Sequence, residues 1–417
     1  MRSGNEADTH ALWPHDRRAV VSGRHHAGGL LEDVPGDRRG LVRGGVARLD
    51  GAVFPSGGAL QDPGPVSLRR ERAPGGGGAD GGAEREARGA GVLPGPRFDL
   101  PIASGGYGWW YVDAVSDDGR HGLTLILMVG SVFSPFYRRE IERGRGDPER
   151  HAAVNLALYD LARPGGSWLG PLFRRKTGDH WVLTEGARVE RDRQSLTIGD
   201  TQATWDGREL RVRVREKTAP LASNVTGTLV VRPAAVEDEV HALDAAGKHI
   251  WSPIAPFGRI EVDFGEPGLR WTGPAYLDHN AGDEPLARGF RGRTWSRMTS
   301  ADRTVVIYDV DRLDGSFHRI ARSFHAGGAR ETYTGGVATL PLSTTRFQMA
   351  RSARAPSGDA AKLGRTLEDT PFYARSHLVG TLDGRPAEGV HEVVDMARFE
   401  SRVVQHMLPY RMRKVSP

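Results

Sequence analysis

The chain has 417 residues, which is enough for two or three domains of ordinary size. It contains no cysteine, and this excludes disulfides, thiolate metal sites, iron–sulfur clusters and cysteine nucleophiles. The net charge is +5, acidic and basic residues alternate along the chain, and no basic stripe suited to phosphate tracking is present. We therefore expect no nucleic-acid partner.

Residues 1–96 are rich in Gly, Arg and Pro and include the run GGGGADGG at 75–82. They show neither helical nor strand periodicity, so they cannot bury enough apolar surface to offset the entropy lost on ordering. We predict a disordered extension here. A competing explanation is upstream sequence included through a misassigned start codon. Neither explanation places chemistry in this segment.

From residue 97 onward, many short segments alternate between apolar and polar residues with a period of two, as strands do. The predicted strands include residues 210–214, 228–231, 260–264 and 304–310. Residues 123–129 are apolar on both faces, as expected for a central strand. Gly/Asp turns recur between the strands, at Asp118-Gly119, Gly199-Asp200, Asp206-Gly207, Asp314-Gly315 and Asp383-Gly384. This pattern favours a mainly β, antiparallel protein with two domains, built as sandwiches or closed barrels.

Helix signals are few, and the best candidate is residues 397–407, which end before Pro409. The longest apolar run, residues 123–133, is about half the roughly 20 residues that a membrane-spanning helix needs. We therefore expect an intracellular soluble protein or one that lies on a membrane surface.

Four aromatic residues are concentrated in one predicted strand: Tyr107, Trp109, Trp110 and Tyr111. Alternation places Tyr107, Trp109 and Tyr111 on one face and Trp110 on the other. One interpretation is that the two faces are a core face and a domain interface. The other is an aromatic wall for a flat or cationic ligand.

A second constellation carries more chemistry. His249 and Trp251 are two residues apart, as are Tyr276 and Asp278, so each pair shares one face of a strand. Two adjacent strands would then place all four in one pocket. Taken singly, such an Asp is more often a turn residue, and such a His is more often a hydrogen-bonded structural residue. No dinucleotide fingerprint, phosphate loop, GxSxG or HExxH is present, which disfavours cofactor-driven redox chemistry and phosphoryl transfer.

Three long blocks of sequence carry a family resemblance: GGYGWWYVDAVSDDGRHGLTLILMVGSVFSPFY at 105–137, HIWSPIAPFGRIEV at 249–262, and WTGPAYLDHNAGDEPL at 271–286. They resemble the acyclic carotenoid 1,2-hydratases, also called hydroxyneurosporene synthases. The resemblance extends from about residue 98 to residue 411, which leaves the extension at residues 1–96 outside it.

The resemblance implies two lipocalin-like, calycin-type antiparallel β-barrel or sandwich domains, at residues 97–240 and 241–412. It also implies a hydro-lyase that adds water to the terminal C1–C2 double bond of acyclic carotenoids such as neurosporene or lycopene, with no cofactor and no metal. The expected location is the cytoplasm, with peripheral contact to the inner, photosynthetic membrane. The oligomeric state is left open.

Site residues follow from the same resemblance. The catalytic acid falls on Asp278, and its supporting residues fall on His249, Trp251 and Tyr276. Asp278 would protonate C2, the aromatic faces would stabilise the tertiary cation at C1, and His249 would orient water. Asp278 would be reprotonated from solvent or through His279 or Asp283. The expected substrate contacts are Tyr107, Trp109, Trp110, Tyr111 and Trp271.

Two other functions remain open at this stage. A non-catalytic lipocalin-like carrier of carotenoid or lipid would need the pocket but not the acid. A related calycin-type pericyclase or isomerase of natural-product biosynthesis would keep the aromatic wall but would not need the His, Trp, Tyr and Asp together.

Overall fold

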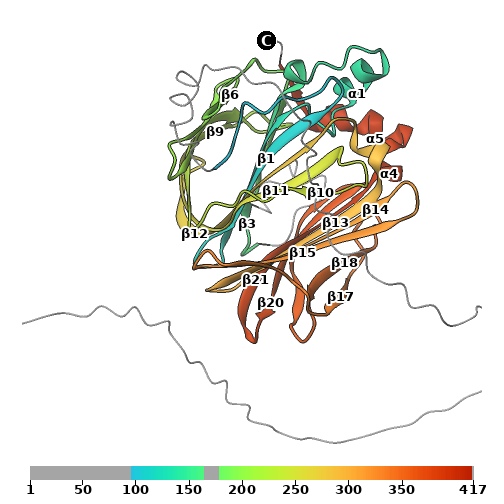
Figure 1. Ribbon diagram of the computed structural model, residues 1–417. Helices are drawn as coiled ribbons and strands as arrows, with labels where there is room; N and C mark the ends of the chain where they lie inside the picture. The colour runs from blue at the N-terminus through green and yellow to red at the C-terminus, as the bar shows by residue number, and fades with distance from the viewer. Residues whose placement is uncertain (1–94, 164–177, 416–417) are drawn as a thin grey trace, which may run out of the picture. The chain divides into compact units, whose positions relative to one another are not determined.

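The computed structural model describes residues 95–163 and 178–415 (Figure 1). The predicted disordered head, residues 1–96, lies almost wholly outside the described residues. Within the described ranges, the chain is mainly β and nearly all strand pairs are antiparallel, which confirms the predicted fold class. No helix in these ranges is long and apolar enough to cross a membrane.

The first sheet has 13 strands and curls into the layer drawn from blue to yellow in Figure 1. Its order is β22-β4-β3-β2-β1-β12-β11-β9-β8-β7-β6-β5, with β10 paired to β11, and only β22 with β4 is parallel. The strands are β1 Tyr107–Val115, β2 His121–Val129, β3 Ala153–Asp160, β4 His180–Glu185, β5 Val189–Arg191, β6 Ser195–Ile198, β7 Thr201–Trp205, β8 Leu210–Lys217, β9 Asn224–Pro233, β10 His241–Ala242, β11 His249–Glu266, β12 Leu269–Gly282 and β22 Arg413–Lys414.

The second sheet has seven strands, in the order β16-β15-β14-β13-β21-β20-β19, and a two-stranded sheet joins β17 to β18. These strands are β13 Phe290–Thr299, β14 Arg303–Arg312, β15 Phe317–His325, β16 Arg330–Thr332, β17 Val337–Leu342, β18 Arg351–Pro356, β19 Ala361–Asp369, β20 Tyr373–Leu382 and β21 Arg385–Asp395. Hydrogen bonding changes from the first sheet to the second between Gly282 and Phe290. The division into domains at residues 240 and 241 stays a prediction.

The short helices are α1 Pro135–Glu142, α3 Leu286–Gly289, α4 Met396–Glu400 and α5 Arg402–Met407, with 3-10 turns η2 Pro148–His151 and η4 Leu408–Arg411. The predicted helix at 397–407 is present but broken at Ser401, whose hydroxyl accepts from the Val404 N–H and begins α5 as an N-cap. Helix α1 is absent from the sequence-based prediction. It begins at the N-cap Ser134, whose hydroxyl accepts from two backbone N–H groups.

The predicted turns are confirmed by backbone geometry. In each of the five Gly/Asp pairs the glycine has a positive φ, between 58° at Gly199 and 96° at Gly207. Such a conformation costs glycine little because it has no Cβ. These turns connect adjacent antiparallel strands and so fix which residues of each strand face the core.

The two sheets pack face to face through a mixed aromatic and charged layer. Its apolar part includes Trp109 and Tyr111 from β1 and Trp295 from β13. Inside it, Arg297 of β13 forms an ion pair with Asp113 of β1, and both side chains are almost fully buried. A separate apolar cluster fills the other face of the first sheet.

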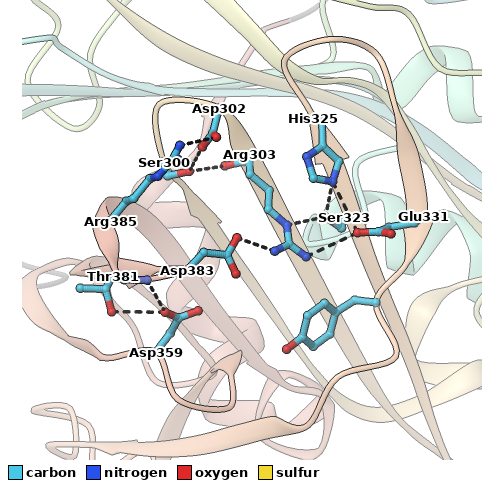
Figure 2. Close-up of polar contacts among 12 residues, drawn as sticks. Ser300, Asp302, Arg303, Ser323, His325, Glu331, Asp359, Thr381, Asp383 and Arg385 are labelled. Carbon is cyan, nitrogen blue, oxygen red and sulfur yellow. Dashed lines mark hydrogen bonds and ion pairs between the residues drawn. The ribbon is translucent and has the colours of Figure 1, made fainter.

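A second group of charges lies at the hairpin ends of the second sheet (Figure 2). Arg303 pairs with Asp383 and Glu331, and Arg385 pairs with Asp302. The partner carboxylates are more than half exposed. Exposed pairs of this kind contribute about 0–1 kcal/mol each to the free energy of unfolding, so this cluster adds little to the association of the sheets.

We predict that Arg297→Ala lowers the free energy of unfolding by about 3–5 kcal/mol, because it leaves the buried Asp113 carboxylate without its cation. The matched control Arg385→Ala, which removes an exposed arginine of the same sheet, should change it by less than about 1 kcal/mol. Urea unfolding of the three proteins measures both values. Equal losses in the two variants would contradict a special role for the buried pair.

Candidate functional site

The candidate site is built where three neighbouring strands of the first sheet meet, since β1 pairs with β12 and β12 pairs with β11. Alternation along β12 turns Tyr276 and Asp278 toward the second sheet, and the same face of β11 carries Trp251. The predicted convergence of residues from two strands is therefore present. It is completed by β1, whose Tyr111 is the register partner of Asp278.

The Asp278 carboxyl group is 4% exposed and has three hydrogen-bond donors. Its Oδ2 accepts from the Trp251 indole Nε1–H at 2.9 Å and from the Tyr276 hydroxyl at 2.9 Å. Its Oδ1 accepts from the Asn280 amide Nδ2–H at 3.1 Å. Trp251 thus presents the N–H at its edge to the carboxyl group, whereas the sequence-based prediction gave it only a ring face.

Burial raises the pKa of Asp278 to about 7, because the charged form loses its hydration between the two sheets. The hydrogen bonds from Trp251 and Tyr276 lower the pKa, and the nearby carboxylates of Glu392 and Asp113 raise it. Loss of hydration is the largest effect. The Asp278 pKa consequently lies near neutrality, where a carboxylic acid can hold and release a proton.

Asn280 is a site residue that the sequence-based prediction missed. Its amide donates to Asp278, and its own Oδ1 is buried without a hydrogen-bond partner among the described residues. Because Asn280 is two residues after Asp278 on the same strand, the alternation that found Tyr276 would also have found it.

His249 lies on the same face but not beside Asp278. It pairs with Gly282 in the β11–β12 register, whereas Asp278 pairs with Pro253, so the two are separated by roughly 13 Å along the strands. The His249 Nδ1 is 2.9 Å from the Tyr107 hydroxyl. Burial lowers the pKa of His249, which favours its neutral form.

Tyr107, Trp109 and Tyr111 of β1, the aromatic wall predicted from the sequence, make two groups of ring contacts. Tyr107 stacks on Trp109 with ring centroids 4.8 Å apart, and the Arg293 guanidinium lies 5.2 Å from the Trp109 ring centroid. Tyr111 meets Tyr276 and Trp295 edge to face at 6.2 and 5.7 Å. These three residues of β1 therefore surround the Asp278 face.

Trp110 and Trp271 are not brought to this site. Both belong to the apolar cluster on the opposite face of the sheet, because each is an odd number of residues from its site-facing neighbours. His279 is also on that opposite face, with its ring centroid 5.0 Å from that of Trp110, and Asp283 is exposed beyond the end of β12. Neither of the two expected proton relays thus contacts Asp278.

Charged residues behind the aromatic wall were also missed. The Tyr111 hydroxyl donates to Asp113 at 2.9 Å and to Glu392 at 3.0 Å, and Arg375 pairs with both carboxylates. Glu392 and Arg375 come from the second sheet, more than 250 residues along the chain from Tyr111. No local pattern links such distant positions, so only the fold reveals this network.

A cavity of about 1240 Å³, counting the part open to solvent, lies against this wall. Tyr111 and Trp109 form part of its lining, and Asp278 does not line it directly. Most of the other lining side chains are apolar or aromatic, among them Ile126, Met128 and Phe372. Among the described residues, no group of three or more His, Asp or Glu is placed to hold a metal ion.

A buried, protonatable carboxyl group beside an aromatic-lined apolar cavity is suited to acid catalysis on an apolar molecule. The comparisons with known proteins agree with this class. The carotenoid hydratase CrtC family model matches residues 125–416. The chain belongs to this family of hydratases and is therefore an enzyme of the lyase class.

Two relatives are similar over nearly the whole chain. The acyclic carotenoid 1,2-hydratase of Thiocapsa roseopersicina is 43% identical over 100% of both chains, so the alignment includes the head that the sequence blocks had left outside. That of Rubrivivax gelatinosus is 44% identical over 93% of this chain and 92% of its own. A crystal structure described as an AttH of Nitrosomonas europaea has a TM-score of 0.48 at 18% identity and covers 73% of this chain and 98% of its own.

The raised pKa of Asp278 predicts a pH dependence of stability. Between the ordinary value of 3.8 and about 7, the folded protein holds a proton that the unfolded chain has released. The free energy of unfolding contributed by this group therefore falls as pH rises through that range. Asp278→Asn cannot ionise, so its stability relative to the parent should increase from pH 5 to pH 8. Urea unfolding at both pH values measures this difference, and an unchanged difference would contradict the raised pKa.

Proposed function

We propose that the enzyme adds water to the terminal C1–C2 double bond of an acyclic carotenoid, such as neurosporene or lycopene, to give a 1-hydroxy carotenoid. The observation that carries the proposal is the Asp278 carboxyl group, which is buried between the sheets and held by the Trp251 and Tyr276 donors on one oxygen. The names of the hydratase relatives support the substrate class.

An isolated alkene is a weak base and needs a strong proton donor in a dry site. Neutral Asp278 would carry its proton on Oδ1, because Oδ2 already accepts two hydrogen bonds, from Trp251 and Tyr276, whereas Oδ1 accepts only one, from Asn280. The O–H bond breaks as the two π electrons of the alkene form a C–H bond at C2. C1 is then a tertiary cation. This protonation also leaves a carboxylate at Asp278.

Electron-rich groups near Asp278 would stabilise the cation. The Tyr111 and Tyr276 rings provide aromatic faces, worth about 0.5–2 kcal/mol each, and the new Asp278 carboxylate is the closest negative charge. Water then forms the C1–O bond, and its surplus proton returns to Asp278 either directly or through a further group. Neutral His249 stays a candidate for that group, although its register position separates it from Asp278.

The cavity would hold the polyene chain. Its lining of Trp109, Tyr111 and apolar side chains matches an elongated hydrocarbon, and the double bond would reach Asp278 past those two rings. No cofactor or metal enters any step. Because the substrate is a lipid, we also propose that the protein is cytoplasmic and associates peripherally with the inner, photosynthetic membrane.

Asp278→Asn should fold and bind carotenoid but lose at least about 10²-fold in hydration rate, because the amide cannot donate an acidic proton. The measurement is chromatographic detection of 1-hydroxy product from lycopene or neurosporene. Asp263→Asn, which alters an exposed carboxylate of β11 paired with Arg270, is the matched control and should keep parental activity. Turnover by Asp278→Asn at the parental rate would exclude Asp278 as the acid.

The rate should also depend on pH. Since the acid must be protonated, the hydration rate should be flat below about pH 7 and fall tenfold per pH unit above it. A pH–rate profile with saturating substrate tests this, with the folded state checked by circular dichroism at each pH. A rate that rises through pH 7 would indicate that Asp278 acts as a base instead.

A further inference from the structure

We propose that the segment formed by α5 and η4, residues 402–411, together with the adjoining Arg413, is the face that docks on an anionic lipid bilayer. This segment would deliver the apolar substrate to the cavity from the bilayer. The inference rests on the proposed function for the reason a lipid surface is needed, but its own support comes from apolar exposure, position and charge.

Two large apolar side chains of this segment are unusually exposed. Val403 is 70% exposed and Tyr410 is 78% exposed. Among the other exposed large apolar side chains of the described residues, Leu221 and Val240 lie on separate loops, and Leu313 and Phe317 share the β14–β15 hairpin, which does not line the cavity. Exposed apolar area gathered in one short segment is typical of an interaction surface.

The same segment forms one wall of the cavity. Val404, Met407 and Leu408 line it, as does Arg411, whose guanidinium lies 5.9 Å from the Trp181 ring centroid. In a helix, residues four apart lie on one side, so exposed Val403 adjoins cavity-lining Met407. The exposed apolar surface is thus continuous with the apolar interior of the cavity.

The charge of the segment indicates an anionic partner. Residues 401–415 contain four cationic side chains and no acidic one. Most arginines among the described residues are ion-paired, but Arg402, Arg411 and Arg413 form no ion pair with any of these residues. Apolar residues interspersed with unpaired cations fit a bilayer of anionic lipids, where each basic residue near the surface strengthens binding by about fivefold.

Figure 1 shows α4 and α5 in the same part of the molecule as α1, and Arg138 of α1 forms an ion pair with Glu400 of α4. Phe399 of α4 and Val404 of α5 are buried in the apolar layer between the two sheets, which anchors the base of the segment. This fixed base would hold Val403 and Tyr410 outward, so docking requires no unfolding of the segment.

Flotation of the full-length protein with vesicles tests the proposal. We expect the parent to float with phosphatidylcholine–phosphatidylglycerol vesicles at low salt, to float less at high salt, and to float weakly with phosphatidylcholine alone. The double variant Val403→Ser with Tyr410→Ser should lose at least tenfold in bound fraction. Arg402→Gln with Arg413→Gln should lose the preference for anionic vesicles.

The matched control is Leu313→Ser with Phe317→Ser, which removes two exposed apolar residues from the β14–β15 hairpin. It should float like the parent. Equal loss in the control, or full flotation of the Val403/Tyr410 variant, would overturn the assignment of this face. Circular dichroism of each variant excludes misfolding as the cause.

Activity separates this proposal from the proposed function. Val403 and Tyr410 do not line the cavity, so their double variant should hydrate detergent-solubilised carotenoid at the parental rate but be at least tenfold slower with carotenoid in anionic vesicles. Normal flotation without hydration of either substrate would reject the proposed function and leave the docking face intact. Equal rates of parent and variant on vesicle substrate would reject the docking face alone.

Discussion

The ion pair of Asp113 and Arg297 is the interaction on which the site depends, because it joins the two sheets over the face that carries Asp278. Closing the sheets removes water from that face, and the loss of hydration raises the pKa of Asp278. The same pair keeps two opposite charges inside the protein, and the Asp113 carboxylate is bound further by the Tyr111 hydroxyl and by Arg375. The same buried charges that join the two sheets therefore also influence the pKa of Asp278.

Local pattern was sufficient for much of the fold. A continuous apolar run identified β2, and period-two alternation identified β8 and divided Tyr107, Trp109 and Tyr111 from Trp110. Glycines with positive φ appear at every predicted turn. Alternation could not predict which strands lie side by side in a sheet. That β1 lies beside β12, more than 150 residues away, depends on tertiary contacts, and so do the contributions of Glu392 and Arg297.

The assignment of Trp110 and Trp271 as substrate contacts shows the same limit. Aromatic density near a family motif suggested a ligand wall, but the side of the sheet on which each ring lies was the deciding quantity. Applied consistently, alternation would have separated both rings from Asp278 and would have added Asn280 to the site. Short helices such as α1 escaped prediction because capping by Ser134, rather than a long amphipathic period, defines them.

The central claim is that Asp278 is a neutral acid near neutral pH. Infrared difference spectroscopy between pH 5 and pH 9 tests it most directly, with Asp278→Asn as the reference that lacks this group. The account predicts a protonated-carboxyl band that titrates with a midpoint near 7 and is missing from Asp278→Asn. No band that titrates between pH 5 and pH 9, as expected for a group with the ordinary pKa of 3.8, or an identical band in the variant, would contradict it.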